Sequence, residues 1–71
     1  MDARNEAKRL VETYTPLIMR IGYTYLHSRE DAEDICQETL IKLVRKKEPF
    51  RGDEHEKAWV VRVAINAART S

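Results

Sequence analysis

Residues 29–47 read REDAEDICQETLIKLVRKK and have the pattern of an amphipathic helix. Their acidic side chains gather in the first half and their basic side chains at the end, an order that complements the helix dipole. Ser28 followed by Asp31 resembles a capping box with a shorter acid. We therefore predict a helix over this stretch, with its apolar residues on one face. These residues are Ala32, Ile35, Cys36, Leu40, Leu43 and Val44.

A second helical pattern precedes this stretch and covers about residues 3–26. Pro16 lies inside it and leaves two arrangements open. Either Thr15 caps a new helix whose first residue is Pro16, or one helix continues with a kink. The expected apolar stripe contains Ala7, Leu10, Val11, Tyr14, Leu17, Ile18, Ile21 and Tyr25.

A third helical pattern follows residues 48–53, a break that holds a proline and a glycine. It covers about residues 54–69, with Asp53 as the expected N-cap and Glu56 as the acid that returns to the cap. The three patterns predict an all-α fold, a small bundle of three to four helices. The expected packing face of the third helix contains Val61, Ala64, Ile65 and Ala68.

Composition excludes several classes of protein. The 71 residues are enough for one small domain, and no apolar run approaches the ~18 residues of a membrane span. The N-terminus lacks the apolar segment of a signal peptide, so we expect a cytoplasmic protein. Cys36 is the only cysteine and, with His27 and His55, has no zinc-type spacing. We therefore expect no metal and no cofactor. The net charge of +1 gives no argument for nucleic acid by itself.

One face of the third helix carries side chains that suit nucleic acid. Arginine can bind phosphates, asparagine can pair with an adenine edge, and tryptophan can stack on an unpaired base. The alternative is an ordinary solvated face with a half-buried tryptophan. Phe50 raises the same question, because it could anchor the loop to the core or hold a flipped base. The face contains His55, Trp59, Arg62, Asn66 and Arg69, with Lys57 as a further basic residue.

The first half of the 29–47 helix carries an acidic strip. Asp31, Asp34 and Glu38 repeat at helical spacing, and Gln37 flanks them. The strip is either a solvated face or a docking surface for a basic partner. Ile41 is apolar but lies off the main apolar stripe, so it is either a peripheral core contact or part of an interface of mixed character.

Four segments resemble one protein family. Residues 31–39, DAEDICQET, resemble the signature of region 2 in bacterial RNA polymerase sigma factors, most closely those of the extracytoplasmic-function (ECF) type of the sigma-70 family. YTPL at residues 14–17, FRGD at residues 50–53 and AWVVRVAIN at residues 58–66 are similar to further motifs of that family, in the same order. The resemblance covers about residues 7–69 and implies a non-enzymatic transcription initiation module in a compact helical bundle.

The resemblance also implies two binding surfaces. The acidic helix of the family docks on the beta-prime clamp of the RNA polymerase core. Its last helix and the preceding loop recognise the promoter −10 element and stabilise the melted, single-stranded non-template strand. By position, core polymerase would contact Asp31, Asp34, Gln37 and Glu38, with Ile41 beside them. Phe50 and Asn66 would lie near the captured base. Arg62 and Arg69 would be candidates for contacts to the DNA backbone, with Arg51 and Lys57 as weaker ones, and Trp59 would be a further DNA-binding residue.

The chain departs from the family pattern at its end. It stops at residues 69–71, where the family's helix continues with further basic residues, and no region 4 follows. We therefore expect residues 1–71 to be a single region 2 domain. It is either excised from a longer factor, which the abrupt ending inside a helical pattern favours, or a natural single-domain relative. The alternative function is a helical protein–protein adaptor without DNA binding. An anti-sigma factor is a further candidate partner, and the oligomeric state stays open.

Overall fold

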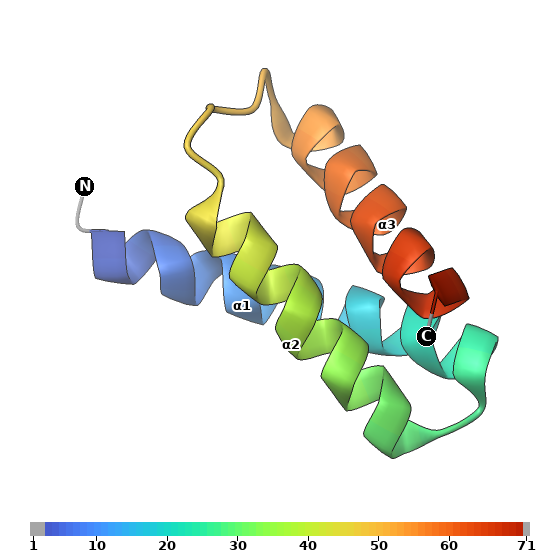
Figure 1. Cartoon of the computed structure of the whole chain (residues 1–71). Coiled ribbons are helices and arrows are strands. Elements are labelled where there is room, and N and C mark those ends of the chain that lie inside the picture. Colours follow the sequence, from blue (N-terminus) through green and yellow to red (C-terminus); the bar gives the residue numbers. More distant parts are fainter. Residues whose placement is uncertain (1–2, 71) are drawn as a thin grey trace.

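The computed structural model describes residues 3–70, which form three α-helices (Figure 1). Helix α1 spans Ala3–Leu26, α2 spans Arg29–Arg45 and α3 spans Asp53–Thr70. The all-α prediction is confirmed. Helix α2 ends two residues before the expected position, because the backbone at Lys46 turns to an extended conformation with φ −65° and ψ 123°.

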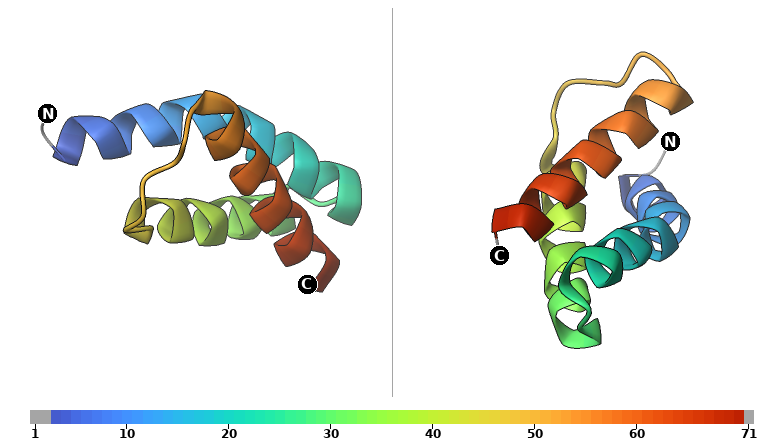
Figure 2. Two further views of the ribbon diagram at one scale, coloured as in Figure 1. Left: turned by 90° about the horizontal axis from the view of Figure 1, so that it is seen from above. Right: turned by 90° about the vertical axis from the view of Figure 1, so that its right-hand side faces the viewer.

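Helix α1 continues through Pro16 as a single helix, which decides between the two arrangements that the sequence left open. Proline removes one backbone donor from the helix. The Thr15 hydroxyl donates to the Val11 carbonyl at 2.6 Å and so reinforces the helical turn that precedes Pro16. The left view of Figure 2 shows that α1 changes direction near its middle.

Helices α1 and α2 form a hairpin with a very short connection. His27 adopts a left-handed conformation with φ 54°, and its N–H donates to the Tyr23 carbonyl at 2.8 Å. Ser28 caps α2 as predicted, since its hydroxyl accepts from the Asp31 N–H at 3.2 Å. Gly22 allows the two helices to approach, because a Cβ there would lie 2.9 Å from the Ala32 Cα.

Helix α3 lies across both helices of the hairpin and closes the core (Figure 2). Ile18 of α1 and Val60 of α3 are fully buried at the centre. Small residues line the inner face of α3, so that its backbone comes close to the hairpin. The buried apolar side chains are Leu10, Tyr14, Ile18, Ala32, Ile35, Cys36, Leu43, Val60, Ala64, Ala67 and Ala68.

The expected apolar stripes need correction at several positions. On α3 the inner face includes Val60 and Ala67, while Val61 and Ile65 are only half-buried. The buried face of α3 is therefore rotated from the predicted one. Val11, Tyr25 and Val44 were expected in the stripes of α1 and α2, but they are exposed because they lie at the outer edges of those stripes.

Glu56 does not cap α3 in the way we predicted from its position. Its carboxylate points to α1, where it accepts from the Tyr14 hydroxyl at 2.6 Å and from Arg9 Nη2 at 3.0 Å. Glu6 also binds this guanidinium, at 2.7 Å. Burial, followed by the hydrogen bond to Glu56, raises the pKa of Tyr14, so its phenol remains a donor. This Arg9–Tyr14–Glu56 cluster ties the first turn of α3 to α1.

Candidate functional site

The acidic strip of α2 faces solvent along its whole length. Asp31, Asp34, Gln37 and Glu38 are all exposed, and Ile41 retains 50% of its accessible surface. Ile41 is therefore no peripheral core contact. The strip is exposed because the buried face of α2 lies on the other side of the helix, where Ala32, Ile35, Cys36, Thr39 and Leu43 pack inward.

The carboxylates of the strip are available to a partner. Asp34 forms no ion pair within residues 3–70, and Glu38 has one with Lys42, at 3.5 Å. Both members of that pair are about half exposed. Exposed pairs one helical turn apart contribute about 0.3–0.5 kcal/mol. A partner that offers a cation to Glu38 can therefore displace Lys42 at little cost.

Phe50 anchors the loop between α2 and α3. Its half-buried ring packs edge-on against Trp59 and His55, with ring centroids 5.6 Å and 5.3 Å away. Lys46 Nζ lies 4.4 Å from the centre of the Phe50 ring. His55 Nδ1 accepts from the Arg51 N–H at 3.0 Å, which fixes the turn into α3. The geometry thus supports the anchoring role of Phe50.

Lys46 is a cation that the sequence analysis missed at this site. It is half-buried, lies over the Phe50 ring and donates to the Glu48 carbonyl at 2.6 Å. Its place in the basic run at the end of α2 was the only available signal. Its position beside the aromatic cluster depends on the path of the loop.

The polar face expected on α3 divides into two parts. His55 and Trp59 are engaged with the loop through Phe50. Arg62, Asn66 and Arg69 are exposed, as are Arg51 and Lys57. Within the described part of the chain, none of the three cations on α3, Lys57, Arg62 and Arg69, forms a salt bridge. Their charges are therefore free to attract phosphate groups.

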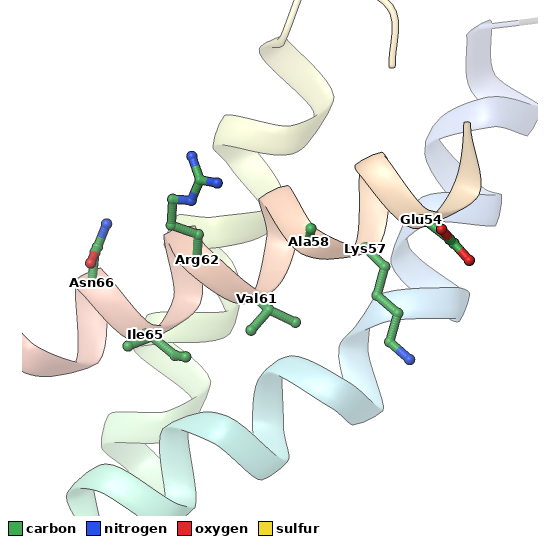
Figure 3. Close-up of a pocket in the computed structure, with 7 residues that line it drawn as sticks. All are labelled: Glu54, Lys57, Ala58, Val61, Arg62, Ile65 and Asn66. Atoms are coloured by element: carbon green, nitrogen blue, oxygen red, sulfur yellow. The ribbon is translucent and has the colours of Figure 1, made fainter. Parts of the chain in front are cut away.

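Two grooves meet at Asn66. The larger, about 560 Å³, runs along the outer surface of α3 and includes Val61, Arg62 and Ile65 (Figure 3). The smaller, about 190 Å³, lies between α2 and α3 and includes Glu38 and Lys42 as well as Asn66. The end of the acidic strip and the polar face of α3 are thus neighbours at this seam, rather than opposite sides of the molecule.

The structure offers no assembled metal site among residues 3–70, where no three His, Cys, Asp or Glu side chains converge. Burial raises the pKa of the Cys36 thiol, which packs in the core.

None of the helices in the described range is long and apolar enough to cross a bilayer.

Residues 10–71 match the family described as sigma-70 region 2. Three curated relatives are similar over most of the chain. RNA polymerase sigma-H factor of Pseudomonas aeruginosa is 37% identical over 60 residues, which are 84% of this chain and 31% of that protein. The ECF RNA polymerase sigma-E factor of Haemophilus influenzae is 43% identical over 60 residues, which again are 84% of this chain and 31% of that protein.

A third relative matches nearly the whole chain. The ECF RNA polymerase sigma factor SigG of Mycobacterium tuberculosis is 30% identical over 70 residues, which are 99% of this chain and 19% of that protein. The chain thus spans a third or less of the length of these relatives. No solved structure matches it significantly.

Proposed function

Because the chain belongs to the sigma-70 region 2 family, we propose that it joins bacterial RNA polymerase core to promoter DNA during transcription initiation. The observation that carries the proposal is the pair of adjoining exposed surfaces. The acidic strip lies on α2, and the unpaired cations and Asn66 lie on α3. Opposite charges on neighbouring surfaces suit a domain that binds a basic protein and a polyanion at the same time.

The acidic strip is the proposed contact for the beta-prime clamp. Asp34 and Glu38 would pair with basic side chains of the clamp, and Gln37 and Asp31 would add hydrogen bonds at the edge. Ile41 would supply the apolar contact at the centre of such a mixed interface. An anti-sigma factor that covered this strip would block polymerase binding.

The loop and α3 are the proposed contact for the melted −10 element. Unpairing a base costs a few kcal/mol, and stacking on Phe50 with an edge hydrogen bond from Asn66 would offset that cost. Arg62, Arg69 and Lys57 would bind the backbone of the non-template strand. With so few cations, the isolated chain should bind DNA weakly and lose affinity with salt. Docking on polymerase would raise the effective concentration of DNA.

Reversing charge on the strip should abolish most polymerase binding. Asp34→Arg and Glu38→Lys are each expected to weaken binding to a beta-prime clamp fragment at least about tenfold, since truncating or reversing one partner of a close charge pair costs about 2–5 kcal/mol. Isothermal titration calorimetry measures the affinity, and circular dichroism checks the fold. Glu12→Lys on α1 is the matched control, an exposed residue with the same charge change. Unchanged binding by both strip variants would reject the docking role.

Asn66→Ala should weaken binding to one promoter-like single strand more than to a scrambled one. An amide that pairs with a base edge contributes about 1–3 kcal/mol of discrimination. Arg69→Ala is the matched control, because a phosphate contact should weaken both strands equally and reduce the salt dependence. Fluorescence anisotropy on both oligonucleotides measures the difference. Equal losses for Asn66→Ala would argue against base reading. Clamp binding without DNA binding, even in the complex with core polymerase, would favour the adaptor alternative.

A further inference from the structure

The large groove on α3 has an aliphatic floor that the proposed contacts do not use. Val61 and Ile65 are half-buried there, and Ala58 is exposed beside them. None of the three belongs to the buried core cluster or to the partly buried hydrophobic side chains that pack against it. No aromatic side chain lines the groove. A ligand in it would therefore meet methyl groups rather than a stacking surface.

The edges of the groove are charged and polar. Figure 3 shows that Arg62 and Asn66 project from one side of α3, and Val61 and Ile65 from the other. Lys57 lies toward the N-terminal end of α3, next to Glu54, the only acid of the lining. Because Lys57 and Arg62 have no carboxylate partner within residues 3–70, the edges favour an anionic ligand. A nucleic acid strand satisfies this requirement and also reaches Asn66.

Thymine is the base whose chemistry fits such a floor. Aliphatic side chains distinguish bases through one feature, the 5-methyl group of thymine, which they contact in direct readout. Stacking, by contrast, is sequence-tolerant and needs an aromatic platform. We propose that the groove formed by Ala58, Val61 and Ile65 binds the 5-methyl face of one thymine in single-stranded DNA, with Arg62 on the neighbouring phosphate. This inference rests on the proposed function and adds a second base-reading position beside the loop.

Deoxyuridine provides a direct test, because it differs from thymidine by the methyl group alone. In a promoter-like single strand, each thymine is replaced by uracil in turn, and the affinity of the chain is measured by fluorescence anisotropy at low salt. Replacement at one position should lower the affinity about two- to fourfold, the value expected for loss of a partly to fully buried methyl group. Replacement of the other thymines by uracil should leave the affinity unchanged.

Variants of the groove locate the effect. Ile65→Ala should remove the difference between thymine and uracil while the variant retains its helical circular dichroism. Since Ile65 is half-buried, a second variant guards against partial unfolding. Ala58→Glu changes an exposed residue and should weaken all DNA binding by charge repulsion, whereas Ala58→Gln, its neutral match in size, should weaken binding much less.

The outcomes separate this inference from the function on which it rests. Equal affinity for thymine and uracil at every position would overturn the methyl contact and leave polymerase and DNA binding intact. A methyl effect that survives Ile65→Ala would also overturn it, because the methyl group would then be read elsewhere. If the groove variants weakened clamp binding instead of DNA binding, the groove would be a protein contact. Absence of binding to every strand would overturn the proposed DNA role itself.

Discussion

Glu56→Ala is expected to lower the free energy of unfolding by about 3 kcal/mol, the cost of leaving buried hydrogen-bonding groups without a partner. Glu56 is only 8% exposed and Tyr14 only 5%. Without the carboxylate, the Tyr14 hydroxyl keeps its buried position and loses its acceptor at 2.6 Å. The Arg9 side chain is about half exposed, so it can form hydrogen bonds with water when Glu56 is removed. The lost contact with Arg9 therefore contributes less to the destabilisation than the lost contact with Tyr14. A loss of this size is a large fraction of the stability of a domain this small.

Two further variants show whether the buried acceptor causes the loss. Glu56→Gln keeps an oxygen for Tyr14 and loses only the charge, so it should cost about 1 kcal/mol. Glu54→Ala removes an exposed acid from the same helical turn and should change stability by less than about 0.5 kcal/mol. Urea denaturation followed by circular dichroism measures all three. Equal losses for Glu54→Ala and Glu56→Ala would show that helix-end charge, rather than the cluster, explains the effect.

Gly22→Ala is expected to destabilise the chain by about 2 kcal/mol, the usual cost of overpacking a close contact. The new Cβ would lie 2.9 Å from the Ala32 Cα and 3.0 Å from its Cβ, so α1 and α2 would have to separate. Alanine is the better helix former by about 1 kcal/mol, which opposes the loss. A net loss therefore identifies the helix crossing as its cause.

Gly52→Ala is the matched control for this prediction. A Cβ at Gly52 would meet no atom within 4 Å, and its φ is not positive. The variant should be within about 0.5 kcal/mol of the parent chain, or slightly more stable because its unfolded state is less flexible. Thermal denaturation compares the two. If Gly22→Ala were as stable as Gly52→Ala, the close approach of α1 to α2 would be disproved.

The candidate site was predictable where it depended on local pattern. Asp31, Asp34 and Glu38 were expected on one face of their helix, and all three are exposed. Helical spacing decides this, because it separates the apolar stripe of α2 from the residues beside it. For Ile41 the sequence left a core contact and an interface residue open, and its 50% exposure decides against the core contact. That Glu38 and Asn66 line the same groove was not predictable, because they come from different helices and meet only where α2 and α3 pack together.

Helix α3 shows where local pattern fails. Val60, Val61, Val63 and Ile65 make it apolar on nearly every side, so periodicity could not identify the buried face. The tertiary structure buries Val60 and leaves Ile65 half exposed. This choice depends on which side lets the α3 backbone approach the hairpin, and the alanines at 64, 67 and 68 provide that side.

The sequence by itself determined the three helices, the Ser28 cap and the break between α2 and α3. Each of these depends on interactions within a few residues, namely side-chain spacing, capping and the backbone limits of proline and glycine. Only the tertiary structure decided that Glu56 binds Tyr14, 42 residues away, instead of its own helix end. Partners so distant in sequence meet through packing of the whole chain, and no local pattern encodes that meeting.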